Sequence, residues 1–182
     1  GMMRVFGHQN GVKAVRETVE ACAELGVKAL TLYAFSTENW NRPKSEVDAL
    51  MKLLISTLRK ELHTLTENNI RLRAIGDLSA LPPDGRRELN EVMSETADNE
   101  HMDLILALSY SARWELVDAV KRMSEEAAKG ELDPEDISEE CISNHLSTAG
   151  IPDPELLIRT SGETRISNFL LWQIAYTELY FT

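Results

Sequence analysis

The chain has no long hydrophobic run and very few cysteines. Its longest apolar stretches are far short of the roughly 20 residues that a membrane-spanning helix needs, so we expect no transmembrane helix. Cys22 and Cys141 are the only cysteines among 182 residues, and they form neither a CxxC motif nor a paired spacing. Both fall in helical patterns, and we interpret them as buried free thiols. Free thiols fit a cytoplasmic location, which is reducing.

Basic residues are scarce relative to acidic ones. Lys and Arg total 19 against 30 Asp and Glu, which gives a net charge of −11. Nucleic-acid binding requires a basic surface that neutralises phosphates, so we expect no nucleic-acid partner. The glycine motifs GxGxxG and GxxxxGK[ST] are also missing, which disfavours nucleotide binding. Against this acidic background, a local group of arginines is informative.

The chain contains no repeat, low-complexity tract or linker that would divide it. Strand patterns are expected at 28–35, 70–76, 103–109 and 155–160. Helical patterns alternate with them, at about 11–25, 45–67, 84–97, 112–128 and 135–148. Ser45 and Asp48 form a capping-box pattern at the start of the long helix. This alternation predicts an α/β fold, with a mostly parallel central sheet flanked by helices on both faces.

Polar loops follow three of the predicted strands. They carry Arg42, Arg113 and Arg165, and Arg159 ends the last strand. Because ligands bind beyond the carboxyl ends of parallel strands, we expect these arginines to share one anion-binding rim. The 160–167 loop combines small residues, which permit a tight turn with free N–H groups, with guanidinium groups that match phosphate oxygens. The alternative is a surface turn with solvated arginines.

Other features allow more than one interpretation. Arg4 and His8 form an RxxxH pair just ahead of the first predicted helix, where an anion or a simple cap is expected. Asn39 could position a proton or satisfy its own turn, and Trp40 could cover an apolar ligand or pack on the domain surface. The apolar stripe of the long helix is wide enough for a lipid cleft, a second helix, a dimer contact or plain core.

Four stretches of the sequence resemble the bacterial cis-prenyltransferases of the undecaprenyl diphosphate synthase family. They are RVFGHQNG at 4–11, LTLYAFSTENWNRP at 30–43, LRAIGD at 72–77 and LIRTSGETRISNFLLWQIAYTELYFT at 157–182. The resemblance implies a single domain over 1–182, a homodimer and Mg²⁺. It also implies transfer of isopentenyl diphosphate in cis onto farnesyl diphosphate. The long polyprenyl diphosphate product is a lipid-carrier precursor for cell-wall synthesis, and its release implies peripheral membrane contact.

The resemblance also assigns roles by position. Asn39 assists removal of the C2 proton, and Glu178 is a magnesium ligand. Arg4 and His8 contact the allylic diphosphate. The remaining substrate-binding positions are the closing loop and the isopentenyl diphosphate site: Ser36, Thr37, Glu38, Trp40, Arg42, Arg159, Arg165, Ile166 and Ser167. The candidate walls of the lipid tunnel are Ala34, Leu50, Leu53, Leu54, Met102 and Leu104.

The chain departs from the family pattern in several places. An N-terminal strand with a catalytic Asp-Gly-Asn-Gly-Arg loop is expected before Arg4, and a basic tail after Thr182, and neither is in the sequence. Ser161 replaces the usual Gly, and Thr164 replaces a common His. If these residues are the whole molecule, we expect an inactive form. A non-catalytic partner subunit is the second hypothesis, although retention of Asn39 and Arg159 argues against it.

Overall fold

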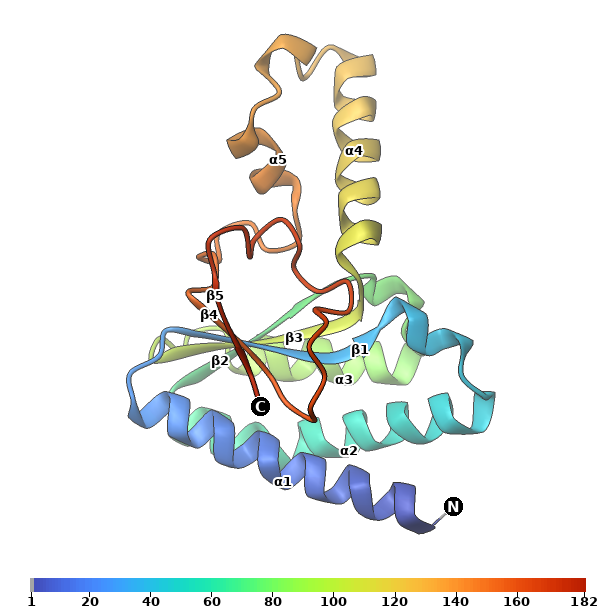
Figure 1. The fold of residues 1–182 in the computed structure, drawn as a ribbon, viewed down its shortest axis with the longest axis vertical. Coiled ribbons are helices and arrows are strands. Elements are labelled where there is room, and N and C mark those ends of the chain that lie inside the picture. The colour runs from blue at the N-terminus through green and yellow to red at the C-terminus, as the bar shows by residue number, and fades with distance from the viewer. Residues whose placement is uncertain (1) are drawn as a thin grey trace.

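The computed structural model describes the backbone of residues 2–182 and the side chains of residues 11–182. A parallel three-stranded sheet forms its centre, in the order β1 (Ala29–Ser36), β3 (Met102–Tyr110), β2 (Ile70–Ile75). The middle strand β3 is apolar along nearly its whole length and buried from Leu104 onward, as expected for a parallel strand covered on both faces. Figure 1 shows this sheet between a layer of helices and a more open second region.

Three helices cover one face of the sheet: α1 (Met2–Glu24), α2 (Lys44–Glu67) and α3 (Pro83–Glu95) (Figure 1). Alternate residues of the strands face these helices, because successive side chains of a strand point to opposite faces. Leu72 of β2 and Leu104 and Leu106 of β3 therefore join one core with Leu58 of α2 and Leu89 of α3. This core is the larger of the two apolar clusters.

The opposite face of the sheet is covered mainly by irregular chain. Ile105 and Ala107 of β3 pack there with Leu170 and Phe169. Phe169 stacks on Tyr33 of β1, with ring centroids 4.4 Å apart and planes at 13°. The α/β class and the parallel sheet are confirmed. The expected helical cover on both faces is correct for one face, whereas a non-helical segment closes the other.

The C-terminal part of the chain extends away from the sheet (Figure 1). Helices α4 (Ala112–Lys129) and α5 (Glu139–His145) form a projecting arm, and β4 (Leu156–Arg159) and β5 (Glu178–Phe181) form a separate parallel pair. The predicted last strand therefore exists but lies outside the central sheet. Its partner β5 was not predicted, because a four-residue strand without flanking turn residues gives little local signal.

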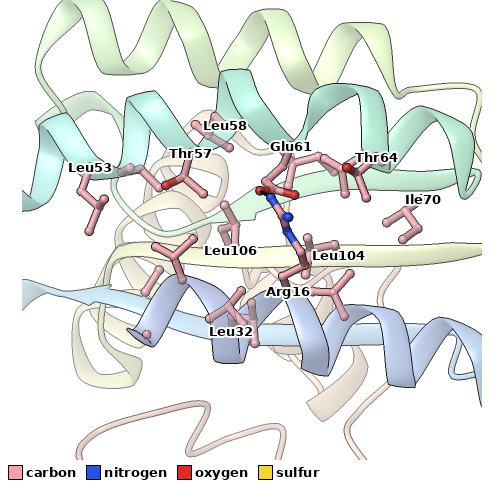
Figure 2. Close-up of a pocket in the computed structure, with 18 of the residues that line it drawn as sticks. Arg16, Leu32, Leu53, Thr57, Leu58, Glu61, Thr64, Ile70, Leu104 and Leu106 are labelled. Atoms are coloured by element: carbon pink, nitrogen blue, oxygen red, sulfur yellow. Dashed lines mark hydrogen bonds and ion pairs between the residues drawn. The ribbon is translucent and has the colours of Figure 1, made fainter. Parts of the chain in front are cut away.

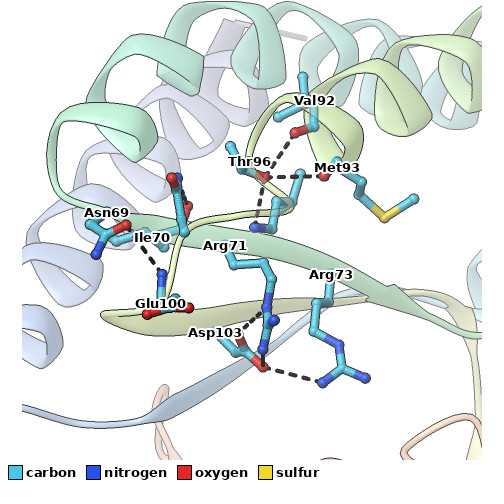
Figure 3. A network of polar contacts seen from close by, with 11 residues as sticks. Asn69, Ile70, Arg71, Arg73, Val92, Met93, Thr96, Glu100 and Asp103 are labelled. Carbon is cyan, nitrogen blue, oxygen red and sulfur yellow. Dashed lines mark hydrogen bonds and ion pairs between the residues drawn. The ribbon is translucent and has the colours of Figure 1, made fainter.

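Two side-chain networks secure the edge strand β2 (Figure 3). The Thr96 hydroxyl accepts the N–H of Leu72 at 3.0 Å and donates to the carbonyl of Val92 at 2.8 Å, which ties α3 to the strand. On the other face, Arg71 donates to both carboxylate oxygens of Asp103 at 2.7 and 2.9 Å. The first contact satisfies a backbone N–H on the open edge of β2, and the second links β2 to β3.

Three expected helix ends were wrong. Helix α1 begins at Met2, so Gly7 and His8 lie within it and not at its amino end. A glycine costs a helix only about 1 kcal/mol, which does not stop a long one. Pro43, and not Ser45, caps α2, because the N–H groups of Glu46 and Val47 bond to its carbonyl. The helix expected over 135–148 is reduced to α5.

Candidate functional site

The loop after β1 is built around Asn39. Residues Thr37–Asn41 form a turn of 3-10 helix. The Asn39 Oδ1 atom accepts the N–H of Ser36 at 3.0 Å, and its carbonyl accepts the N–H of Arg42 at 3.1 Å. The side-chain oxygen of Asn39 therefore satisfies its own turn, as one interpretation predicted. Its side-chain N–H₂ group is the part that can donate a hydrogen bond to a ligand.

Trp40 fastens the same loop to the neighbouring strand. Its indole N–H donates to the hydroxyl of Ser109 at 2.9 Å. Its ring meets Phe35 edge to face, with centroids 4.8 Å apart. The tryptophan is thus packed at the margin of the large core, half-buried, and its orientation is fixed by a polar partner at the end of β3.

The 160–168 loop contains several residues in unusual conformations. Ser161 and Gly162 have φ of 74° and 67°, in the left-handed region that glycine adopts without strain. The sequence predicted free N–H groups in this loop that could bind an anion. The N–H of Gly162 is not free, because it donates to the carbonyl of Thr182 at 3.1 Å.

The arginines of this loop are held by neighbouring side chains. Arg159 donates to the Ser167 hydroxyl at 3.1 Å, and Arg165 pairs with Glu163. Two predicted diphosphate ligands, Arg159 and Ser167, are therefore brought together.

Asn168 joins three polar segments. Its side-chain nitrogen donates to Glu38 Oε1 at 3.0 Å, and its Oδ1 accepts the N–H of Arg113 at 3.0 Å. Its backbone carbonyl accepts the N–H of Ala112 at 2.8 Å. The three loops that the sequence placed on one rim do meet. They meet through Asn168, since β4 does not belong to the central sheet.

The remaining predicted arginines have local partners or lie outside the description. Arg42 donates to Glu46, one helical turn away, at 2.8 Å. The side chains of Arg4 and His8 lie outside the described residues. Ile166 is half-buried beside Ser167. Each of these three arginines therefore has its own partner: Glu46 for Arg42, Ser167 for Arg159 and Glu163 for Arg165.

The rim contains an acidic group, Glu38, whose pKa is lowered. The hydrogen bond from Asn168 is the main cause that lowers the pKa of Glu38, which therefore stays ionised. Burial, with a further contribution from the Glu38 carboxylate, raises the pKa of the nearby Tyr33 phenol to about 12. Tyr33 therefore stays neutral and donates to the Tyr110 carbonyl at 3.0 Å.

Glu178, the predicted magnesium ligand, begins β5. It pairs with Leu156 at the amino end of the ladder, whereas Arg159 and Phe181 pair at the carboxyl end. No group of three or more His, Cys, Asp or Glu side chains arranged to bind a metal occurs among the described residues. An exposed carboxylate such as Glu178 still suits Mg²⁺, which is commonly bound by one or two carboxylates together with substrate phosphates.

An apolar pocket of about 480 Å³ lies between α1, α2 and the sheet (Figure 2). Five of the predicted tunnel residues line it: Ala34, Leu50, Leu53, Leu54 and Leu104. Met102 does not line it and is 1% exposed within the core, so that assignment was wrong. Phe35 lines the pocket and touches Trp40, so the apolar space begins directly beneath the polar rim. No helix within residues 2–182 is both long and apolar enough to cross a membrane.

An ion pair across this pocket was not predicted from the sequence. Arg16 of α1 and Glu61 of α2 both line the pocket and bond to each other (Figure 2). Their separation of 45 residues gives no local signal. Asn168 was missed for the same reason, since its partners at 38 and 113 are distant in sequence.

A polar rim above an apolar pocket, on a parallel α/β sheet, defines a protein suited to a ligand with an anionic head and an apolar tail. Comparison with known families places it more narrowly. The family model described as putative undecaprenyl diphosphate synthase matches residues 1–182. The chain therefore belongs to the undecaprenyl diphosphate synthase family of prenyltransferases.

Individual relatives agree with this assignment. The chain is 55% identical to an isoprenyl transferase of Porphyromonas gingivalis, over all of this chain and 72% of that protein. It is 48% identical to the farnesyl-diphosphate-specific ditrans,polycis-undecaprenyl-diphosphate synthase of Vibrio cholerae, again over the whole chain and 73% of the relative.

Two solved structures are similar in fold. Lavandulyl diphosphate synthase of Lavandula x intermedia, in complex with dimethylallyl diphosphate, has a TM-score of 0.93 at 39% identity, covering 97% of this chain and 76% of that one. A probable undecaprenyl diphosphate synthase of Campylobacter jejuni has a TM-score of 0.84 at 40% identity, covering 96% and 79%.

Proposed function

We propose that this chain is a cis-prenyltransferase that elongates farnesyl diphosphate with isopentenyl diphosphate units to a long polyprenyl diphosphate. The observation that carries the proposal is the contact between Phe35 in the apolar pocket and Trp40 in the polar loop. This contact supports the proposal because it joins the polar loop to a cavity that suits a hydrocarbon chain. The names of the relatives, which include farnesyl-specific synthases, support the same reaction.

The binding steps follow from the residues. Arg159, oriented by Ser167, offers a guanidinium to the diphosphate of isopentenyl diphosphate, with Arg165 and Ile166 beside it. Two diphosphates held at one rim convert a bimolecular reaction into a local one. The growing tail enters the pocket, where each buried methylene contributes roughly 0.8 kcal/mol.

The chemical step requires loss of diphosphate from the allylic substrate and of a proton from C2 of the new unit. The side-chain oxygen of Asn39 accepts the Ser36 N–H, which orients its N–H₂ group. This group can only donate, so we assign it to hold, by a hydrogen bond, the diphosphate oxygen that accepts the C2 proton. Ser36, Thr37 and Glu38 form the loop that closes over the reactants, with Trp40 and Arg42 beside the reacting ends. Bound Mg²⁺, with Glu178 as a ligand, would stabilise the negative charge of the leaving diphosphate.

The proposal also covers assembly and location. Leu156, Ile158 and Tyr180 on the β4–β5 pair are more than half exposed. Parallel strands are normally buried on both faces, which supports a further covering element and a homodimer. The free thiols of Cys22 and Cys141 support a cytoplasmic protein that contacts the membrane peripherally when the product leaves.

The experiment is a radiolabel assay with the full-length protein. Labelled isopentenyl diphosphate, farnesyl diphosphate and Mg²⁺ should give a butanol-extractable polyprenyl product, and EDTA should abolish it. A reaction without farnesyl diphosphate is the control. Folded protein with intact loops that incorporates no label would end the proposal.

A further inference from the structure

We infer that Asn168 is a positioning residue that couples the closing loop at 36–42 to the segment at 165–168. The inference rests on the proposed function, because it concerns the two halves of that same site. Asn168 bonds directly to Glu38 in the first half. Its neighbour Ser167 holds Arg159 in the second half.

The contacts of Asn168 need an amide and no other side chain of its size. Its nitrogen must donate, because the partner is the carboxylate of Glu38 at 3.0 Å. Its oxygen must accept, because the partner is the N–H of Arg113 at 3.0 Å. Asp in this position would face Glu38 with a second carboxylate, and Ala would lose both bonds.

The backbone around Asn168 is held in a strained form. Ser167, Asn168 and Leu170 have φ of 58°, 59° and 47°. Each non-glycine residue in the left-handed region costs on the order of 1–3 kcal/mol and persists only where the surroundings over-determine it. Asn tolerates this region better than most residues. Strain at three of four consecutive positions is a feature of sites whose geometry matters for function.

The anchors that maintain the strain are apolar and lie next in sequence. Phe169 stacks on Tyr33 of β1 at 4.4 Å, and Leu170 is 4% exposed. These two residues therefore anchor the segment on the central sheet, while the side chain of Asn168 bonds to Glu38 of the neighbouring loop. A displacement of the 36–42 loop is passed through the Glu38–Asn168 bond to Ser167, and from Ser167 to Arg159.

The test compares Asn168→Asp with Asn168→Ala in the full-length enzyme. The Asp variant keeps the acceptor for the Arg113 N–H, and its negative charge is favourable at the amino end of α4. It should therefore lose less thermal stability than the Ala variant. At pH 8 its repulsion of Glu38 should reduce kcat/KM for isopentenyl diphosphate by about 10–100-fold, because adjacent carboxylates disfavour each other.

Lowering the pH separates positioning from a structural role. Repulsion between two adjacent carboxylates raises the pKa at which the pair takes up one shared proton, and that proton restores a hydrogen bond between positions 38 and 168 as the pH falls. The ratio of variant to wild-type kcat/KM should therefore recover several-fold between pH 8 and pH 6. Tyr33, whose phenol lies beside Glu38, is neutral throughout this range. The Ala variant should be impaired at both pH values with no recovery.

The outcomes are distinct. A ratio for Asn168→Asp that is near one, or that is low but independent of pH, would overturn the inference. So would a loss of thermal stability equal to that of Asn168→Ala, since this would indicate a purely structural residue. An inactive wild type would refute the proposed function itself, and with it the inference that rests on it.

Discussion

The N-terminal and C-terminal parts of this molecule are stabilised in different ways. Residues 2–110 form a layered unit in which α1, α2 and α3 pack on a three-stranded sheet through one continuous apolar core. Residues 111–182 form the arm, the β4–β5 pair and the coil that returns to the sheet, with short elements and several polar links. Close packing of apolar side chains stabilises the first part, and specific hydrogen bonds stabilise the second.

A buried polar network shows the difference clearly. Glu115 at the base of α4 is 2% exposed, and its carboxyl oxygens accept from Tyr110 at 2.6 Å and from Gln173 at 3.1 Å. Ser147 donates to it through both its N–H, at 2.8 Å, and its hydroxyl. One side chain thus joins the sheet, the arm and the returning coil. The candidate site lies at the boundary of the two parts, so its loops take their apolar support from one and their polar positioning from the other.

The largest effect is expected from a cavity in the layered unit. Leu89 of α3 is completely buried, so Leu89→Ala should lower the free energy of unfolding by roughly 2–5 kcal/mol. Leu89→Met, which conserves volume, should cost less than about 1.5 kcal/mol. Urea unfolding monitored by circular dichroism measures both. Equal losses for the two variants would show that this part does not depend on volume.

An isosteric change should be costly in the C-terminal part. Glu115→Gln keeps the shape but turns an N–H₂ group toward donors, and we expect a loss of roughly 1.5–3 kcal/mol. This loss should exceed that of Leu89→Met, although both variants preserve volume. The same urea titration decides it, and a neutral Glu115→Gln would contradict the distinction between the two parts.

The same distinction explains what the sequence could predict. The β1 and β3 patterns were placed within a residue or two, because apolar runs between turn residues report burial locally. Helix α4 was also placed within a residue, whereas α5 was predicted too long and β5 was missed. Their positions depend on contacts such as that of Glu115 with Gln173, which are 58 residues apart. At the site, the sequence motifs predicted Arg159 and Ser167 together. They did not predict Asn168, whose conformation and partners exist only after folding.

Binding at the boundary can be tested through Arg159. Arg159→Ala removes a charge-assisted contact worth about 1.5–3 kcal/mol, so the KM for isopentenyl diphosphate should rise by roughly 10–100-fold. Arg86→Ala serves as the matched control, because Arg86 is an exposed arginine on α3, away from the rim. Steady-state kinetics with saturating farnesyl diphosphate measures both variants. An unchanged KM for Arg159→Ala would remove this residue from the site.

The smallest effect is expected in the arm, at His145 of α5. Its Nδ1 lies 2.7 Å from the carbonyl of Cys141, and its Nε2 lies 2.9 Å from Glu126 Oε2 of α4. Both partners accept hydrogen bonds, so only the doubly protonated ring satisfies both. The Cys141 carbonyl, followed by Glu126, raises the pKa of His145, and Arg122 opposes them.

Because the folded pKa of His145 is raised, its stabilising effect is complete below the unfolded value of about 6.5 and is lost as the pH rises through the folded value. The Tm of the wild type should therefore fall by about 1–2 °C more between pH 6 and pH 8 than that of His145→Gln, a small change because Glu126 is partly exposed. Differential scanning calorimetry at both pH values gives this difference, in which contributions common to the two proteins cancel. Parallel curves for the two proteins would mean that the arm, unlike the rest of the C-terminal part, does not depend on this polar contact.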